Sequence, residues 1–434
     1  MRTIVVVGGG AGGLELATRL GDSLGKRRAA KIVLVDRLPT HFWKPLLHEV
    51  AAGKTDPGVH QLDYRAHALE HHFEFVQGAL TGLDRVNRRI ELAASCDANS
   101  VELLPIRRIA YDTLVLAFGS VTNFFSVPGA FEHCVTLDTV GQAEAFRRTM
   151  IEALMRAGNG RQAQGARKGI DIAIVGGGAT GVELAAELRN TAIALRHYNV
   201  HDLDPVQDIR IRIVEAGARI LPHLKAQVSS RTAALLKLLH VDISTGKCVS
   251  AVTASTVEIA GGETYAADIA VWAAGIAAPP VCATLGLPVN RIGQLLVGPT
   301  LQSTCDAGIF AIGDCASAPW KEQDARLPPR AQVAHQQALF LARVLRKQAV
   351  SGALPEFRYR DYGSLVSLGR FSAVGALVGG IAGKGIFVEG LLASLLYSSL
   401  YRKHVLALHG ARRMTFDTMM HWLRARTSPS VKLH

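Results

Sequence analysis

Two stretches of the chain share one order of apolar, glycine and mixed positions. The first, TIVVVGGGAGGLELATRL, begins at Thr3, and the second, IDIAIVGGGATGVELAAEL, begins at Ile170. In each stretch a short β-branched run predicts a buried strand of a parallel sheet, and apolar positions spaced three and four residues apart predict the helix that follows. The pattern therefore predicts two copies of a unit made of a strand, a glycine turn and a helix.

The turn of each copy has the spacing GxGxxG. Its glycines are Gly8, Gly10 and Gly13 in the first copy and Gly176, Gly178 and Gly181 in the second. Glycines at these places allow a tight turn, let the backbone approach a pyrophosphate and let the helix lie close to the strand, while free N–H groups at the helix start bind the phosphates. Because each turn follows a strand and opens a helix, the copies predict two dinucleotide sites.

An acidic residue after the next strand completes each site. KIVLVDR supplies Asp36 and IRIRIVEAG supplies Glu215, and either carboxylate can accept hydrogen bonds from ribose hydroxyls. The interval from Gly181 to Glu215 exceeds the usual spacing of about 20 residues, so we expect a lengthened helix or an insertion there. A carboxylate at Glu215 would repel a 2′-phosphate, which favours NADH over NADPH. Two sites indicate one bound flavin and one transient nicotinamide, because a hydride needs an acceptor beside it.

The positions of the two copies predict an α/β protein with two doubly wound, Rossmann-like domains, the second inserted in the first. We expect residues 1–125 and 290–345 to form one domain and residues 165–285 to form the inserted domain. The Gly-rich, polar residues 155–169 are typical of a connecting loop. Residues 350–434 form a C-terminal region of different texture, which begins with glycine-punctuated, strand-like sequence.

The composition is that of a globular chain with few charges. Hydrophobic residues make up 49% of the 434 residues and charged residues 19%, below the roughly 25% of an average soluble domain. The six cysteines form no CxxC pattern, so we expect reduced thiols and no metal site. The first residues run directly into a predicted strand, and no signal peptide is recognisable, so we expect the folded part to stay in the compartment where it is made.

The C-terminal region is basic and apolar. Lys and Arg total 48 against 36 Asp and Glu, which gives a net charge of +12. From Gly390 onward the only acidic residue is Asp417, and the basic residues are Arg402, Lys403, Arg412, Arg413, Arg424, Arg426 and Lys432. Interleaved basic and apolar positions favour an anionic membrane surface over nucleic acid. The alternative is a solvated basic tail.

Two apolar segments of this tail could lie in a membrane interface. The uncharged run from Gly390 to Tyr401 is shorter than the roughly 20 residues that span a bilayer. MTFDTMMHWLRAR, which begins at Met414, has apolar residues close to basic ones, as in-plane amphipathic helices do. A dimerisation or core-packing helix is the alternative interpretation.

A further candidate for a functional role is the predicted helix in PPRAQVAHQQA. Gln332, His335 and Gln336 stand at i, i+3 and i+4, so they share one face.

The segment IFAIGD is a predicted strand that ends in Gly313 and Asp314. There Gly313 would allow close approach, and Asp314 would bind a flavin ribityl hydroxyl or serve as a helix N-cap.

With these motifs the chain resembles the two-dinucleotide-domain flavoproteins of the pyridine nucleotide-disulfide reductase superfamily, and within it the type II NADH:quinone oxidoreductases. Beyond the two glycine turns, the resemblance rests on HFWKPLLHEVAAG, YDTLVLAFGS, VWAAG, IFAIGD and AQVAHQQA. It implies that the first domain binds FAD and the inserted one NADH. The implied FAD residues are Gly8, Gly10, Gly12, Gly13, Asp36, Arg37, Lys44, Pro45, Ala79, Ala117, Gly119, Gly313, Asp314, Gln332 and Val333. The implied NADH residues are Gly176, Gly178, Thr180, Gly181, Glu183, Glu215, Ala274 and Gly275.

The resemblance also implies an activity and its residues. A hydride would pass from NADH to FAD and two electrons on to a membrane quinone, without ion pumping. Gln332 and Gln336 would line the quinone pocket. His335 is either a further ligand or a satisfied core histidine. Glu183 is either a proton donor or relay or a charge that compensates a helix dipole, and Lys384 would stand near the quinone entrance.

A second function remains open on the sequence alone. A soluble NADH-dependent flavoprotein reductase could pass electrons to a protein partner, with the tail as its interaction surface. Reductases of the thioredoxin and glutathione type need a paired cysteine beside the flavin, which this sequence lacks. For the quinone reductase we expect a peripheral protein on the cytoplasmic face of the inner membrane, and a homodimer is one assembly that the sequence leaves open.

Overall fold

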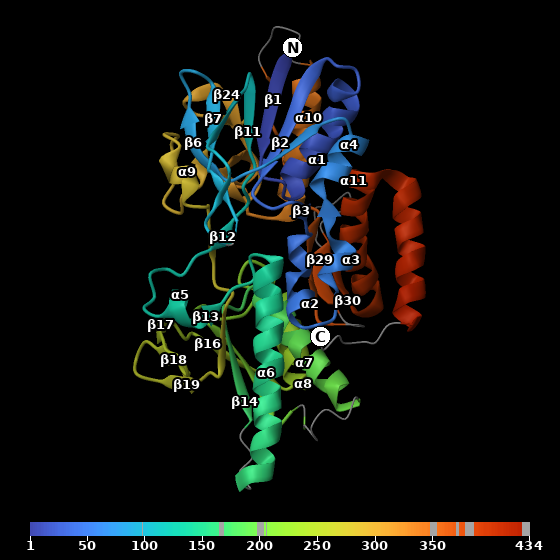
Figure 1. Cartoon of the computed structure of the whole chain (residues 1–434). Coiled ribbons are helices and arrows are strands. Elements are labelled where there is room, and N and C mark those ends of the chain that lie inside the picture. Colours follow the sequence, from blue (N-terminus) through green and yellow to red (C-terminus); the bar gives the residue numbers. More distant parts are fainter. Residues whose placement is uncertain are drawn as a thin grey trace. The chain divides into compact units, whose positions relative to one another are not determined.

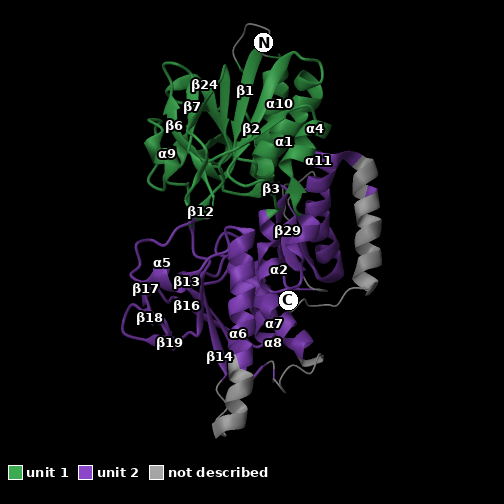
Figure 2. Ribbon diagram, in the orientation of Figure 1, with its two compact units in different colours: residues 1–43, 61–121, 276–360 green, residues 44–60, 122–275, 361–434 purple. Residues whose placement is uncertain are grey.

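The computed structural model describes residues 1–97, 99–164, 169–197, 204, 206–347, 354–369, 373–377 and 386–427. They form two compact units (Figure 2). Unit 1 contains residues 1–43, 61–121 and 276–360, and unit 2 contains residues 44–60, 122–275 and 361–434. Residues 44–60 thus group with unit 2, although they lie within the first 125 residues.

Unit 1 is built on a six-stranded sheet in the order β23-β24-β11-β1-β2-β5 (Figure 1). All neighbours are parallel except β23 and β24. The strands are β1 (Arg2–Val7), β2 (Ala30–Asp36), β5 (Glu74–Gln77), β11 (Thr113–Leu116), β23 (Gln302–Ser303) and β24 (Asp306–Ala311). The predicted strand TIVVV is β1, and its central residues are fully buried because a parallel sheet is covered on both faces.

Two helices of unit 1 pack against each other beside this sheet, α1 (Ala11–Leu20) and α10 (Ala331–Lys347). A small antiparallel sheet has the order β10-β7-β6, with strands Arg107–Ala110, Arg89–Leu92 and Leu80–Asp84. The remaining helical elements are η1 (Gly21–Gly25), α4 (Tyr64–Glu70), α9 (Val281–Thr284), η3 (Gly313–Cys315) and η4 (Lys321–Gln323). Short strands are β3 (Thr40–His41), β4 (Leu62–Asp63), β8 (Ser95–Cys96), β9 (Glu102–Leu104), β21 (Ile276–Ala277), β22 (Leu295–Leu296), β25 (Ala316–Ser317), β26 (Pro319–Trp320) and β27 (Ala325–Arg326). The two residues of strand β12 (Val121–Thr122) belong to different units, Val121 to unit 1 and Thr122 to unit 2.

Unit 2 repeats the plan with a parallel five-stranded sheet in the order β13-β20-β14-β15-β16. The strands are β13 (Cys134–Val135), β14 (Ile170–Val175), β15 (Ile209–Glu215), β16 (Val241–Thr245) and β20 (Ile269–Trp272). The helices are η2 (Lys44–Leu46), α2 (Leu47–Ala51), α3 (Pro57–His60), α5 (Ala130–His133), α6 (Val140–Gln164), α7 (Ala179–His197) and α8 (Ala226–Leu238). The expected α/β fold with two doubly wound dinucleotide-binding folds is confirmed.

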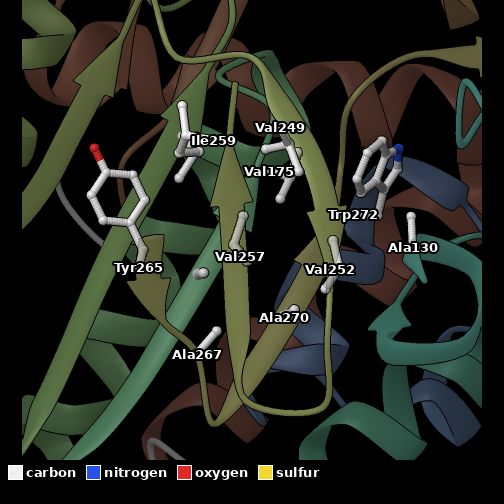
Figure 3. Packing of buried hydrophobic residues seen from close by; sticks show 12 residues of the cluster. Ala130, Val175, Val249, Val252, Val257, Ile259, Tyr265, Ala267, Ala270 and Trp272 are labelled. Carbon is white, nitrogen blue, oxygen red and sulfur yellow. The ribbon is translucent and has the colours of Figure 1, made fainter. Parts of the chain in front are cut away.

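A second sheet covers one face of these strands. It is antiparallel, with β17 (Val249–Val252), β18 (Thr256–Ile259) and β19 (Thr264–Ala266). Val257 of β18 is fully buried and lies in one apolar cluster with Val175, Ala270 and Trp272 (Figure 3). This packing fixes the ends of β14 and β20, from which the second glycine turn and the VWAAG segment emerge.

The C-terminal part of unit 2 is an antiparallel sheet covered by a helix. Its strands are β28 (Gly363–Ser367), β29 (Ala373–Leu377) and β30 (Ile386–Glu389), as the strand-like sequence predicted. α11 (Gly390–Thr427) packs on all three strands and contains a non-helical residue, Gly410, at φ 73°. Among the described residues no helix is long and apolar enough to cross a membrane.

Two expectations about helices have different outcomes. The interval before Glu215 is a lengthened helix, because α7 continues to His197, whereas α1 ends at Leu20. The connecting loop predicted for residues 155–169 is wrong for most of its length, because α6 continues to Gln164. Its alanine, arginine and glutamine residues favour helix enough to offset the cost of two glycines.

Candidate functional site

The first glycine turn has the shape that a bound pyrophosphate needs. Gly8 has φ 105°, and a Cβ there would lie 2.3 Å from the Ala117 carbonyl oxygen. A Cβ on Gly13 would lie 1.9 Å from the Gly8 oxygen, so the helix could not sit this close to the strand. Beside Gly10, in contrast, a Cβ would meet no atom within 4 Å. The open space therefore lies at the start of α1, where N–H groups point outward.

The second turn repeats this arrangement in unit 2. Gly176 has φ 110°, with the Ala273 backbone 2.7 Å from its hypothetical Cβ, and the equivalent distance from Gly181 to the Gly176 oxygen is 2.1 Å. Gly178, like Gly10, faces open space. Both turns thus fit a dinucleotide for the same steric reason, which the spacing of the glycines predicted.

The two acidic residues are held by backbone groups of the turns. The Asp36 carboxylate accepts hydrogen bonds from the N–H groups of Gly9 at 2.6 Å and Leu38 at 2.8 Å. The Glu215 carboxylate accepts from Gly177 and Gly217, both at 2.6 Å. Each carboxylate is therefore locked beside its glycine turn, in the place where ribose hydroxyls would meet it.

Side chains that the sequence did not single out support the first turn. The Tyr64 hydroxyl donates to the Gly9 oxygen at 2.7 Å, and Nδ1 of His41 lies 2.9 Å from the same oxygen. The Gly313 N–H donates to Oε1 of the buried Gln337 at 2.7 Å. Gln337 stands next to the predicted Gln336, but its distant partner left no signal in the sequence.

Asp314 is not a helix N-cap. It is the central residue of the short helix η3, and its Oδ2 accepts a hydrogen bond from the Ser120 hydroxyl at 2.9 Å. Ser120 follows Gly119, which has φ 73° and open space beside it. This geometry leaves the flavin-binding interpretation of Asp314 as the better of the two.

The three polar residues of α10 have different surroundings. Nδ1 of His335 lies 2.6 Å from Oε2 of Glu15, which favours the core-histidine interpretation. The amide of Gln336 donates to the Arg360 oxygen at 2.8 Å and accepts from the Arg360 N–H at 3.0 Å. Gln332 and the buried Val333 lie at the first turn of the helix.

The other predicted FAD residues are spread over both units. In unit 1, Gln77 donates a long side-chain hydrogen bond to the Arg37 oxygen at 3.4 Å, and the Ala79 oxygen accepts from Ala93 at 2.9 Å. Lys44 and Pro45 begin η2 in unit 2, and Lys44 forms an ion pair with Asp138 at 3.0 Å.

The remaining predicted NADH residues lie around the second turn. Thr180 is in the first turn of α7, and the Ala274 oxygen accepts a hydrogen bond from Trp272 at 3.0 Å. Gly275 has φ 75°, and the Phe125 ring occupies the space where its Cβ would be. Lys384 lies outside the described residues.

Glu183 is buried in unit 2 and has three polar neighbours. Its Oε1 accepts from the Ser367 N–H at 3.1 Å, the Tyr397 hydroxyl hydrogen-bonds to it, and its Oε2 lies 3.6 Å from Nδ1 of His48. Burial raises the pKa of Glu183 to about 8 and lowers the pKa of His48 to about 4. Burial thus favours the protonated form of Glu183. It lies beyond the first turn of α7, so helix-dipole compensation does not explain it.

A second buried charge group lies one turn further along α7. The Lys54 ammonium contacts Glu187 at 2.8 Å and Glu49 at 3.1 Å, and the Thr55 hydroxyl donates to Glu49 at 2.7 Å. Burial alone would raise the pKa of Glu49, but Lys54 and His48 outweigh it and lower that pKa. Burial raises the pKa of Glu187, against the effect of Lys54.

The sequence carried a signal for this group that was missed. Glu187 follows Glu183 by four residues on a helix whose other residues there are apolar, so both carboxyl groups share a buried face. His48 and Glu49 lie inside the motif HFWKPLLHEVAAG, and only the fold brings them to α7. Ligand atoms of His48, Glu49 and Glu187 lie within 4.8 Å of one another, and Lys54 supplies a cation there.

Comparisons with known proteins agree with this geometry. Residues 2–338 match the pyridine nucleotide-disulphide oxidoreductase family. The type II NADH:quinone oxidoreductase of Haemophilus influenzae is 40% identical over an alignment that covers 100% of both chains. The demethylphylloquinone reductase of Synechocystis is 29% identical and covers 92% of this chain and 91% of its own.

A solved structure adds a likeness of fold. NDH2 from Plasmodium falciparum, in complex with NADH, has a TM-score of 0.82 at 19% identity, and the match covers 99% of this chain and 100% of that one. The family match spans most of the chain and the Haemophilus relative aligns along all of it. The chain therefore belongs to the pyridine nucleotide-disulphide oxidoreductase family and, within it, to the type II NADH:quinone oxidoreductases.

Proposed function

We propose that this enzyme transfers a hydride from NADH to FAD and passes two electrons on to a membrane quinone. The observation that carries the proposal is the pair of glycine turns, each with a locked carboxylate, in a chain that aligns along its whole length with a type II NADH:quinone oxidoreductase. FAD supplies the hydride acceptor and the electron donor for quinone. The alternative, a soluble reductase with a protein partner, is not favoured by these relatives.

The site at the first glycine turn would hold FAD, and the site at the second glycine turn would hold NADH. In unit 1, Gly10 offers the backbone beside open space, Asp36 would bind the adenosine ribose, and Asp314 the ribityl chain. The start of α10 at Gln332 and Val333 would direct its N–H groups at the flavin's pyrimidine edge. In unit 2, Gly178 and Glu215 have the corresponding roles for NADH.

Arg219 lies close to Glu215 in sequence. Its guanidinium donates to the oxygens of Pro222 and Leu224, both at 2.9 Å. These neutral partners leave its charge in place, so the preference for NADH rests on the Glu215 carboxylate, which would repel a 2′-phosphate.

Glu183 is the proton donor of the proposed reaction. It is protonated at neutral pH, so it can give a proton to a group that gains electrons. Gln332 and Gln336 remain quinone-side candidates as neutral donors, and the role of Lys384 stays a prediction from the resemblance. The Gln336 amide pairs with Arg360 in this structure.

The proposed function is tested by mixing experiments on the purified flavoprotein. NADH should bleach the yellow flavin absorbance, and a short-chain quinone should restore it. Glu183→Gln should leave bleaching within a few fold of wild type and slow the restoration. A wild-type protein that bleaches with NADH but passes nothing to quinone would contradict the proposal.

α11 supports attachment to an anionic membrane surface. Its buried face, with Ala393, packs on the C-terminal sheet, whereas Leu391, Leu392 and Leu395 are 60 to 65% exposed. Arg402 continues this exposed face, because it stands eleven residues after Leu391. Leucines beside cations suit lipid headgroups and acyl chains together. The side chains of the amphipathic segment from Met414 lie almost wholly outside the described residues. We assign the protein to the cytoplasmic face of the inner membrane.

Substitutions test this attachment better than truncation does. Deletion from Gly390 onward would also uncover the sheet and remove Tyr397 from Glu183. Replacing Leu391, Leu392 and Leu395 by Ser should abolish co-sedimentation with anionic vesicles and leave the flavin spectrum unchanged. Replacing the exposed Leu238 at the end of α8, outside α11, by Ser is the control. Full binding by the triple variant would contradict this role of α11.

A further inference from the structure

The proposed reaction consumes one proton from solution for each quinol. NADH gives two electrons and one hydrogen, whereas a quinol carries two hydrogens, so the balance is NADH + H⁺ + quinone giving NAD⁺ + quinol. If Glu183 donates that proton, it must be supplied with another one in every turnover. Glu183 is 9% exposed, so direct contact with water is limited. The inference below rests on the proposed function.

Four side chains of unit 2 connect Glu183 to a partly exposed cation. His48 is 3% exposed and lies 3.6 Å from Glu183. Glu187, 2% exposed, and Glu49, 14% exposed, each have an oxygen within 4.8 Å of a ring nitrogen of His48. Lys54, 32% exposed, contacts both carboxylates. His48 and Glu187 are thus almost completely buried, and the exposed fraction is highest at Lys54.

We propose that this group is the route by which the proton reaches Glu183, with His48 as the relay and Lys54 as the residue that positions Glu49 and Glu187. His48 has two ring nitrogens, and its Nε2 is buried without a hydrogen-bond partner among the residues that the structure describes. Nδ1 lies 3.6 Å from Glu183, and the His48 side chain also hydrogen-bonds to the backbone of Pro45. The unpartnered nitrogen is a place where a proton can be taken up or released.

The proton transfers balance without another reactant. Glu183 gives its proton to the group that gains electrons and becomes a carboxylate. His48, neutral at pH 7, forms an N–H bond with a proton that a Glu49 or Glu187 carboxylate takes from water and passes on, as its other N–H bond breaks and its proton passes to Glu183. Both carboxylates are ionised again once the proton has passed. The net charge of the group is the same before and after each turnover.

The groups that act on these side chains come from three elements. α2 and the residues after it provide His48, Glu49 and Lys54, α7 provides Glu183 and Glu187, and α11 provides Tyr397. Lys54 is the cation among them. Without it, Glu49 and Glu187 would be two adjacent buried carboxylates, and like charges so close cannot both ionise.

The test separates the two halves of the reaction in the holoenzyme. Stopped-flow absorbance follows flavin bleaching by NADH and then its recovery with a short-chain quinone. For His48→Gln and Lys54→Met we expect bleaching within twofold of wild type and recovery slower by about tenfold, most strongly at alkaline pH. Lys54→Arg should restore recovery, because it keeps the cation. Arg231→Met, which breaks the surface ion pair with Glu389 in the same unit, is the control.

Infrared spectroscopy gives a readout that does not depend on turnover. The carbonyl band of a buried protonated carboxyl group should disappear with a midpoint near pH 8 in wild type and be absent from Glu183→Gln. Lys54→Met should add a second such band at neutral pH, because Glu49 and Glu187 must then share a proton. If His48→Gln fails to fold, this measurement still tests the protonation of Glu183 and the positioning role of Lys54.

The outcomes distinguish the two proposals. If quinone never restores the wild-type flavin, the proposed function fails. If Glu183→Gln is slow but His48→Gln and Lys54→Met recover at the wild-type rate, the function stands and the proton route is overturned. Lys54→Met without a new carboxyl band would equally overturn the positioning role of Lys54.

Discussion

Glu15 of unit 1 and Glu183 of unit 2 occupy the same position in two copies of one motif, yet their surroundings differ. Each is the fifth residue of the helix after its glycine turn, in AGGLELATR and ATGVELAAE. Glu15 accepts from Arg19 at 2.8 Å and lies 2.6 Å from His335. Glu183 meets the Ser367 N–H, the Tyr397 hydroxyl and a His48 that is neutral at pH 7.

The residue four places later accounts for much of this difference. It is Arg19 in α1 and Glu187 in α7, and residues four apart share one helix face. The arginine gives the first glutamate a counter-ion, whereas the glutamate at the matching position of α7 supplies none and itself pairs with Lys54 from another segment. One scaffold thus holds a glutamate paired with Arg19 in one copy and a buried acid of raised pKa in the other.

The largest expected effect comes from replacing each glutamate in turn. Glu183→Gln should slow recovery of the flavin by quinone by about 100-fold, because the proton donor is lost. Glu15→Gln should leave this rate unchanged per bound FAD but lower the stability by about 2 kcal/mol, because Arg19 and His335 lose a charged partner. Stopped-flow absorbance and thermal unfolding measure the two effects. Equal losses of rate in both variants would remove the distinction between the copies.

The two locked carboxylates sharpen the comparison further. Glu215→Gln should raise the efficiency with NADPH relative to NADH by about tenfold, because the repulsion of a 2′-phosphate is removed. Asp36→Asn, the matched change in unit 1, should weaken retention of FAD and leave the nucleotide preference alone. Steady-state kinetics with both nucleotides and the ratio of flavin to protein test this. An unchanged preference in Glu215→Gln would mean that another residue sets it.

Much of the fold and of both predicted dinucleotide sites could be predicted from the sequence, because local patterns determine them. Strand, turn and helix follow from apolar spacing and glycine, so Gly8, Gly10 and Asp36 in the first copy could be placed by residue number. The roles within the site are less local. His335 gave no sign of its partner Glu15, which is 320 residues away.

The buried charge group of unit 2 could be predicted only in part, because the spacing of Glu183 and Glu187 is a local signal but their partners are distant in sequence. Lys54 and Glu187 are 133 residues apart, and neither belongs to a recognisable motif with the other. The helical continuation of residues 155–164 was missed because glycine and polar residues suggest a loop, while the alanines and arginines around them sustain α6. Contacts between segments that are far apart in the sequence determine these features.

The smallest expected effect is a difference in the pH dependence of stability. Glu183 has a pKa of about 8 when folded and 4.5 as its ordinary value, so folding takes up a proton between these pH values and stability falls as pH rises through them, by at most about 1.4 kcal/mol per pH unit. The pKa of His48 falls from 6.5 to about 4 on folding, so its contribution rises with pH but is complete by pH 6.5. Between pH 6.5 and 8 only the effect of Glu183 remains from this pair. Thermal unfolding of the holoenzyme should therefore show a wild-type Tm that declines relative to Glu183→Gln across this window. Parallel curves for wild type and Glu183→Gln would mean that Glu183 is already ionised in the folded protein.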